Sequence, residues 1–414
     1  MGQVRRFTLG EAEAMDIGDL LAPLRQQFEL PDGVIYLDGN SLGALPRGVK
    51  ARMADVVSRQ WGEGLIRSWN THDWIDLPSR LGDRIARLIG APERTVTVAD
   101  STSINLFKAL SMALLFRPDR GVIVSEAETF PTDTYIAQGG ADLLGQGHQL
   151  RLVEPGQLAS AITRDVAVVL LTEVNYKTGA RHDMRAITTF AHEMGALTVW
   201  DLAHSAGAFP VDLFGARADF AVGCGYKYLN GGPGAPAFIY VAPEHHYGLR
   251  QPLTGWLGHE APFAFEADYR PAEGIEAMRV GTPPILSMSA LDAAIDVFDR
   301  VDLQLVREKA DALFDLFVTE VLAQTQELEL VTPLEPERRG TQVSFRFAEG
   351  YAAMQALIAR GVIGDFRGPD IMRFGLTPLY LRYADVWRAA SILAQVMRRR
   401  EWDRPEFKVK AKVV

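Results

Sequence analysis

Apolar runs and segments of helical periodicity alternate along the chain up to about Pro252. The run at 166–171 is continuous, which is typical of a central strand buried on both faces of a sheet, whereas residues 148–153 alternate like a strand. The predicted strands cover residues 95–99, 122–124, 148–153, 166–171, 197–200, 220–222 and 238–241. Strands that alternate with helices indicate an α/β fold with a mostly parallel, seven-stranded sheet flanked by helices. In such a fold, ligands bind beyond the carboxyl ends of the strands.

The alternation stops after Pro252, and residues 252–284 are irregular and rich in proline, glycine and aromatic residues. Beyond them the periodicity predicts a smaller α+β unit. Its helices cover 285–298, 303–325, 351–360 and 384–399, and its strands cover 341–347 and 371–376. We therefore predict a large domain at 60–284 and a small domain made of residues 1–59 and 285–414.

The composition is that of a globular protein, with 414 residues of which 48% are hydrophobic and 23% charged. A formal net charge of −9 argues against nucleic acid or an anionic membrane as the partner. No apolar run approaches the ~20 residues of a membrane-spanning helix, and no N-terminal targeting segment is evident. The single cysteine, Cys224, excludes an intrachain disulfide and fits a reducing compartment. We expect a cytoplasmic protein.

One lysine stands between two predicted strands. Lys227 follows the strand at 220–222, lies between Tyr226 and Tyr228, and precedes a turn rich in glycine and proline. An unpaired buried ammonium is costly to desolvate, so this position needs a reason. A lysine in a partly dry pocket has a lowered pKa and can form a Schiff base with a carbonyl group. The alternative is a surface lysine whose stem reaches out to water.

Polar residues follow other predicted strands at their carboxyl ends. After the strand at 95–99, Thr102 and Ser103 open a helix whose backbone N–H groups can bind a phosphate. The alternative is an ordinary helix cap, for which Ser and Thr are common. After the next strand, Phe130 can lie on a planar ring and Asp133 can accept a hydrogen bond from a cofactor or stabilise a cation. Here the alternative is a turn with a capping residue.

The strand at 197–200 is followed by Asp201 and His204. A carboxylate at a buried strand end is costly unless it is paired, and a pyridinium nitrogen is one suitable partner. A structural Asp–His pair is the alternative, and no His or Cys cluster at ligand spacing supports a metal site. An anion site, a ring-stacking side chain, a buried carboxylate and Lys227 together are what a site for pyridoxal 5′-phosphate (PLP) requires. Dinucleotide and nucleoside triphosphate fingerprints are absent from the sequence.

Longer motifs carry a resemblance that spans nearly the whole chain. They are Tyr36-Leu-Asp-Gly-Asn-Ser-Leu-Gly43, Phe130-Pro-Thr-Asp133, Asp201-Leu-Ala-His204, Gly223-Cys-Gly-Tyr-Lys-Tyr-Leu-Asn-Gly-Gly-Pro-Gly234, Arg279-Val-Gly-Thr-Pro-Pro-Ile-Leu286 and Arg373-Phe-Gly-Leu-Thr-Pro-Leu-Tyr380. With these motifs the chain resembles the aspartate-aminotransferase superfamily of PLP enzymes (fold type I) and, within it, the kynureninase family. The resemblance implies a large PLP-binding domain and a smaller α+β domain.

The resemblance also implies a role for each matching residue. Lys227 would be the Schiff-base lysine, Asp201 the partner of the pyridine nitrogen, and Tyr226 a phosphate ligand and a candidate proton relay. The other implied cofactor contacts are Thr102, Ser103, Phe130, Asp133 and His204, with Trp256 and Thr282 supplied by the second subunit of a homodimer. Arg373 would bind the substrate α-carboxylate, because a guanidinium suits bidentate recognition. Asn40 and Ser41 would border the substrate.

The activity that the resemblance implies is hydrolysis of the Cβ–Cγ bond of L-kynurenine to anthranilate and L-alanine. Its setting would be tryptophan catabolism, with a link to pyridine nucleotide biosynthesis. 3-Hydroxykynurenine is a second possible substrate, and Trp61, Trp69, Asn70 and Trp74 are candidates to shape the aryl pocket.

Two other functions remain open at the level of sequence. A cysteine desulfurase or selenocysteine lyase shares the PLP residues but needs a mobile cysteine late in the chain, whereas the only cysteine is Cys224. A catalytically inactive homologue that acts as a binding protein is the non-enzyme alternative, which the intact set of Lys227, Asp201 and Arg373 disfavours.

Overall fold

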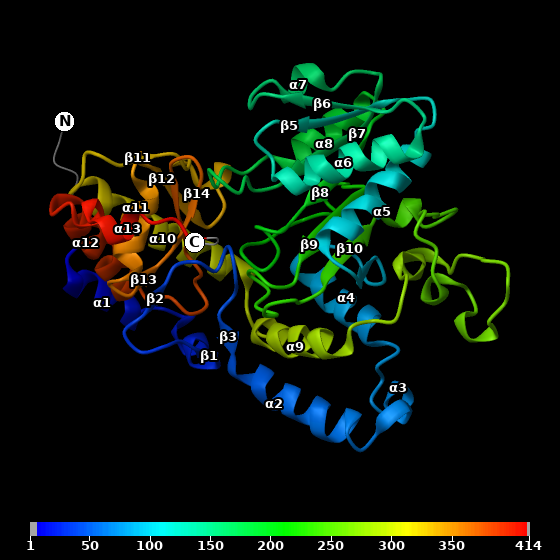
Figure 1. The fold of residues 1–414 in the computed structure, drawn as a ribbon, viewed down its shortest axis with the longest axis horizontal. Coiled ribbons are helices and arrows are strands. Elements are labelled where there is room, and N and C mark those ends of the chain that lie inside the picture. The colour runs from blue at the N-terminus through cyan, green and yellow to red at the C-terminus, as the bar shows by residue number, and fades with distance from the viewer. Residues whose placement is uncertain (1–5, 412–414) are drawn as a thin grey trace. The chain divides into compact units, whose positions relative to one another are not determined.

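The computed structural model describes residues 6–411, so residues 1–5 and 412–414 of the predicted small domain lie outside the described part. The chain forms two compact units. The larger unit consists of residues 49–176 and 182–295, and the smaller one of residues 1–48, 177–181 and 296–414. Figure 1 shows the elements of both units along the chain.

The larger unit is built, within the described residues, on a seven-stranded sheet with the order β4-β10-β9-β8-β7-β5-β6. The strands are β4 (Val96–Val98), β5 (Val122–Glu126), β6 (Gln149–Val153), β7 (Val166–Thr172), β8 (Leu197–Asp201), β9 (Phe220–Cys224) and β10 (Ala237–Val241). All neighbours are parallel except β10, which runs antiparallel to both β4 and β9. The predicted sheet is confirmed, including its mostly parallel character.

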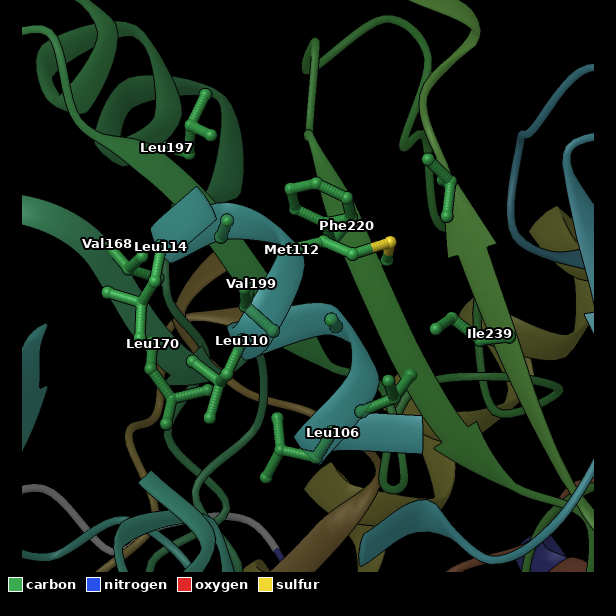
Figure 2. Packing of buried hydrophobic residues seen from close by; sticks show 14 of the residues in the cluster. Leu106, Leu110, Met112, Leu114, Val168, Leu170, Leu197, Val199, Phe220 and Ile239 are labelled. Atoms are coloured by element: carbon green, nitrogen blue, oxygen red, sulfur yellow. The ribbon is translucent and has the colours of Figure 1, made fainter. Parts of the chain in front are cut away.

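Helices cover this sheet, as the alternation of strands and helices predicted. Those that pack against its strands are α4 (Leu77–Leu88), α5 (Thr102–Leu115), α6 (Pro131–Leu144), α7 (Leu158–Ala161) and α8 (Met184–Glu193). The same unit also contains α3 (Ser68–Thr71) and α9 (Ile285–Ile295). Figure 2 shows how α5 lays Leu106, Leu110 and Leu114 over the sheet, where they join Val199 of β8 and Phe220 of β9 in one buried cluster. These side chains are almost wholly removed from water, and burial of that kind is the main stabilising contribution to a fold.

The direction of the strands decides where polar residues gather. Because β4 and β9 are both antiparallel to β10, they run in the same direction as each other and as β5, β7 and β8. The residues that follow these strands therefore leave the sheet at one edge. The backbone N–H of Ala237, where β10 begins, bonds to the carbonyl of Asp100 just after β4 (2.9 Å), which ties that edge together.

The smaller unit has a four-stranded antiparallel sheet with the order β11-β12-β15-β14 in the described residues. Its strands are β11 (Glu329–Leu330), β12 (Gln342–Arg346), β14 (Asp365–Arg367) and β15 (Ile371–Gly375). Short pairs join β1 (Phe28–Glu29) to β3 (Leu45–Pro46), and β2 (Ile35–Tyr36) to β13 (Val362–Ile363). The helices are α1 (Leu9–Ile17), α10 (Leu303–Leu322), α11 (Gly350–Ile358), α12 (Tyr383–Arg398) and α13 (Pro405–Lys408), and α2 (Arg47–Asp55) leads into the larger unit.

The domain limits predicted at residues 60 and 284 differ from the structural division. Residues 49–59 and 285–295 belong to the larger unit. The physical reason is a buried ion-pair cluster in which Asp292 of α9 binds Arg52 of α2 (2.6 Å) and Arg84 of α4 (2.7 Å). The five residues 177–181 belong instead to the smaller unit, where Gly340 N–H donates to the Gly179 carbonyl (2.9 Å).

Some local features were not predicted. Helix α1 is followed by a short 3₁₀ segment at Ala22–Gln27, and α2 continues into a π-helical turn at Val56–Trp61. None of the helices in residues 6–411 has both the length and the apolar character needed to cross a lipid bilayer.

Candidate active site

The polar residues predicted at the strand ends of the larger unit are brought together around Lys227. Its Nζ atom lies 3.3 Å from Nε2 of His204, which follows β8. The same ammonium nitrogen lies 5.9 Å from the ring centre of Phe130 and 5.8 Å from that of Tyr226. Lys227 is half-buried, so the surface alternative, a lysine that extends freely into water, does not describe it.

Two carboxylates lie close enough to Lys227 to interact with it electrostatically. Asp201 ends β8 and is 4% exposed, and its Oδ1 accepts a hydrogen bond from the backbone N–H of Ala203 (2.7 Å). Burial raises the pKa of Asp201, against the opposing effects of the Lys227 charge and of that hydrogen bond. Burial also raises the pKa of Asp133 well above its usual range, with the charge of Asp201 adding to the effect and Lys227 opposing it. The charge on one of these carboxylates therefore affects the protonation of the other.

Asp133 does not cap its helix, contrary to the alternative considered for this stretch. It lies in the first turn of α6, whose capping position is Phe130, and its side chain is 1% exposed. Its Oδ2 atom has no hydrogen-bond partner among the described residues. A buried carboxylate oxygen without a partner is costly, so Asp133 has unused capacity for a hydrogen-bonding ligand.

The start of α5 has both a helix cap and the backbone groups of a potential phosphate site, the two interpretations that the sequence allowed. Ser101 is the capping residue, and its side chain accepts from Ile104 N–H (3.4 Å). Thr102 and Ser103 occupy the first turn, where backbone N–H groups have no partner within the helix. These groups and hydroxyls, at the positive end of the helix dipole, can bind an anion such as a phosphate.

A buried lysine that the sequence did not suggest holds this helix start in place. Lys108 is 0% exposed and donates to Oδ2 of Asp100, to Oδ1 of Asn105 (3.3 Å) and to the carbonyl of Met278 (2.7 Å). Asp100 has a left-handed backbone (φ 49°), which is uncommon for a residue other than glycine. The signal available in the sequence was a lysine within the apolar periodicity of α5.

Phe130 and Cys224 complete the surroundings of Lys227. The Phe130 ring meets that of Tyr176 edge-on at 5.3 Å, and Tyr176 was missed although it lies just beyond the carboxyl end of β7. Cys224 is buried, and its Sγ lies 3.8 Å from the Ala203 carbonyl. Burial raises the pKa of its thiol, which makes it a poor nucleophile.

Trp256 and Thr282, the two residues expected to act across a subunit interface, lie in exposed segments of the same unit. Trp256 is 38% exposed and meets Phe263 edge-on at 5.7 Å. Thr282 is exposed and lines, together with Asp100, a cavity of about 50 Å³. Among the candidates for the aryl pocket, Trp69 and Trp74 meet edge-on at 5.9 Å and Trp61 is 55% exposed.

The predicted substrate residues Arg373, Asn40 and Ser41 form a cluster of their own within the smaller unit. Arg373 of β15 is 1% exposed and donates to Ser41 Oγ (3.1 Å). Its guanidinium also forms a two-point ion pair with Asp365 of β14, a residue absent from the sequence predictions. Asn40 is buried and donates from Nδ2 to Gln342 Oε1 (3.1 Å).

The larger unit thus has the residues that PLP requires, judged from its own geometry. The start of α5 suits the phosphate, and Phe130 can contact a ring. Asp201 is a buried carboxylate that a protonated ring nitrogen would balance, Asp133 has an unpartnered oxygen, and the Lys227 amine lies among them. In residues 6–411 no group of three or more His, Cys, Asp or Glu side chains is arranged to bind a metal ion.

Comparison with known proteins gives matches in sequence and in structure. Residues 306–393 match the family model of the kynureninase C-terminal domain. The chain is 54% identical to a kynureninase from Pseudomonas fluorescens over 98% of this chain and 99% of that protein. It is 53% identical to a kynureninase from Burkholderia mallei, again over 98% and 99% of the two chains.

Among solved structures, the chain is similar to a cysteine desulfurase from Thermococcus onnurineus, with a TM-score of 0.76, 21% identity and coverage of 91% of this chain and 98% of that one. It is also similar to the cysteine desulfurase CsdA from Escherichia coli, with a TM-score of 0.76, 19% identity and coverage of 92% and 98%. At such low identity these matches establish a shared fold and nothing about substrate.

Proposed function

Because the chain belongs to the kynureninase family, we propose that it hydrolyses the Cβ–Cγ bond of L-kynurenine, with PLP as cofactor, and releases anthranilate and L-alanine. The observation that carries the proposal beyond family membership is the arrangement around Lys227. The amine lies beside His204, 5.9 Å and 5.8 Å from the ring centres of Phe130 and Tyr226, and within electrostatic reach of two buried carboxylates. The reaction belongs to tryptophan catabolism.

PLP, when bound, supplies an electron sink for the bonding pair that is released at the substrate α-carbon. Lys227 is the amine that would hold the cofactor aldehyde, and once free it would move a proton at the α-carbon. Asp201 would keep a proton on the ring nitrogen. A carboxylate in this buried position interacts strongly with a neighbouring cation because little water screens the charge.

Thr102 and Ser103 would hold the phosphate at the start of α5, while Phe130 would contact the ring face and Asp133 and His204 would flank the cofactor. Tyr226 is proposed as a phosphate ligand and proton relay. Burial raises the pKa of its phenol, so the hydroxyl stays protonated at neutral pH and can donate a proton or a hydrogen bond.

In the smaller unit, Arg373 would bind the substrate α-carboxylate, with Asn40 and Ser41 beside it. A guanidinium is always charged and holds its N–H donors in one fixed plane, which suits recognition of a carboxylate. We also propose a homodimer in which Trp256 and Thr282 contribute to the partner's cofactor phosphate. The exposure of both residues is compatible with that role. Light scattering of the purified protein at several concentrations tests the dimer.

The desulfurase alternative shares the fold but requires a reactive cysteine. Cys224 is buried in the larger unit and burial raises the pKa of its thiol, which opposes thiolate formation. The hydrolase proposal is therefore favoured by the side chains as well as by the family.

A direct assay tests the proposal. Purified protein is incubated with PLP and L-kynurenine, and anthranilate is followed by its fluorescence while L-alanine is measured separately. Equal amounts of the two products are expected. A parallel reaction with 3-hydroxykynurenine compares the two substrates, and one with L-cysteine is assayed for sulfide. Sulfide from L-cysteine without anthranilate from L-kynurenine would replace the proposal with the desulfurase activity.

A further inference from the structure

Arg373 is held by a carboxylate that the proposed reaction does not yet use. Asp365 of β14 lies directly opposite Arg373 of β15 in the antiparallel register. Arg373 Nε donates to Asp365 Oδ1 (2.6 Å), and Nη2 donates to Oδ2. Each of the two residues is 1% exposed. The strand register therefore brings the two side chains together, and water hardly screens their charges.

A hydroxyl and a second arginine complete the contacts of Asp365. Ser41 Oγ donates to Asp365 Oδ2 (2.7 Å) and accepts from Arg373 Nη2 (3.1 Å). Arg367 Nη2 lies 2.8 Å from the same Oδ2 atom. Burial alone would raise the pKa of Asp365, but the hydrogen bond and charge of Arg373, with help from Arg367 and Ser41, lower it. Asp365 is therefore ionised at neutral pH.

The loop that contains Asp38 and Asn40, and nearby Thr377, have buried polar atoms that lack hydrogen-bond partners among the described residues. Asp38 Oδ1, Asn40 Oδ1 and Thr377 Oγ1 are buried and have no hydrogen-bond partner among the described residues. The loop lies tightly against the end of β15, since a Cβ added to Gly375 would lie 2.1 Å from Asn40 Oδ1. Native structures rarely leave several such atoms unsatisfied at one place unless a ligand or water binds there.

We propose that Asp365 is a positioning residue, which fixes the guanidinium plane of Arg373 so that it recognises the α-carboxylate of an amino-acid substrate. This inference rests on the proposed function. A buried ion pair by itself is weak evidence for stability, because apolar residues of similar volume are often as stable. The orientation of Arg373, however, is fixed by the Asp365 carboxylate at Nε and by the Ser41 hydroxyl, which accepts a hydrogen bond from Nη2. A fixed orientation matters for an arginine that must direct its donors toward a ligand.

The test separates recognition of the carboxylate from simple loss of structure. Asp365→Asn keeps the shape of the side chain but removes its charge. We expect the KM for L-kynurenine to rise about tenfold or more with kcat within about threefold of the parent. The inhibition constant of the decarboxylated analogue of L-kynurenine, which keeps the amine and the aryl ketone but has no carboxylate, should change less than twofold. Asp365→Glu restores a carboxylate, so its KM for L-kynurenine should lie between that of Asp365→Asn and that of the parent.

A control removes one of the two acidic partners, Asp311 and Asp315, of another buried arginine in the same unit. Arg339 is 1% exposed and its Nη2 lies 3.1 Å from Asp311 Oδ1. Asp311→Asn should lower thermal stability and leave both the KM and the analogue's inhibition constant unchanged. If Asp365→Asn does not fold, Asp365→Glu alone provides the test, with an expected rise in KM of several fold confined to the ligand that has a carboxylate.

The possible outcomes are distinct. A KM for Asp365→Asn equal to that of the parent, or a lower one, overturns the inference. The inference also fails if the binding of L-kynurenine and the binding of the decarboxylated analogue are weakened equally. Failure of the parent protein to release anthranilate would instead refute the proposed function. A selective loss of carboxylate binding in Asp365→Asn supports the positioning role.

Discussion

Lys108 offers a quantitative test of how the anion-binding start of α5 is held. Its ammonium is 0% exposed and has three acceptors: Asp100, Asn105 and the Met278 carbonyl. Lys108→Met replaces it with an apolar side chain of similar length, so no large cavity is formed. What is lost is the partner of a carboxylate and of a buried carbonyl.

The expected cost follows from these contacts. Removing one member of a buried ion pair costs about 3–5 kcal/mol. The low end applies here because the Asp100 side chain remains 31% exposed and keeps part of its hydration. We therefore expect a loss of about 3 kcal/mol, which corresponds to a urea midpoint lower by roughly 1 M if the slope is about 3 kcal/mol per M.

Urea denaturation of the cofactor-free protein, followed by far-ultraviolet circular dichroism, measures this loss. The exposed Lys410 provides a control, since Lys410→Met should leave the midpoint unchanged. A midpoint for Lys108→Met within 0.2 M of the parent, or about 0.6 kcal/mol at that slope, would refute the reasoning. The Lys108–Asp100 pair would then have to be energetically neutral.

Three further predictions concern the site residues. Lys227→Ala should abolish anthranilate formation and the visible absorption of the PLP-loaded protein; a colourless variant that still turns over would contradict the role of Lys227. Arg373→Ala should raise the KM for L-kynurenine by ~30-fold or more, the equivalent of about 2 kcal/mol, and an unchanged KM would contradict carboxylate binding. Burial, with the charge of Asp365, raises the pKa of Asp38 to about 7, so between about pH 4 and pH 7 the folded protein holds a proton that the unfolded chain releases. Stability should therefore fall as pH rises through this range, and Asp38→Asn should reduce that slope in urea titrations; equal slopes would show that Asp38 titrates normally.

Most of the sheet of the larger unit could be predicted from sequence because every strand except β6 is buried at all of its positions. Val166–Thr172, for example, is buried at every position and reads as a continuous apolar run. The direction of β10 was not accessible, since its apolar run looks the same in either direction. Its antiparallel pairing depends on the glycine-rich turn between Lys227 and Ala237, which returns the chain to the same edge.

The site residues of the larger unit could be predicted from the sequence more fully than those of the smaller unit. Asp201 and Lys227 were found because residues at the carboxyl ends of parallel strands share one edge. Asp365 was missed because its partner is chosen by the register of two strands joined by a short turn, and a single aspartate in a short apolar stretch carries no such signal. The role of Lys108 was missed for a related reason: its place in the apolar periodicity of α5 signals burial, but nothing local indicates that the distant Met278 carbonyl is its partner.

The division of the chain has a consequence for its synthesis on the ribosome. The smaller unit takes its residues from both ends of the chain and from the short segment at 177–181. Strand β2 near the N-terminus pairs with β13, which is translated more than 300 residues later (362 − 35 = 327). The larger unit ends at Ile295 and can fold while the rest is still being made. Strand β2 must therefore wait for β13, and the smaller unit, with Arg373 and Ser41, is completed last.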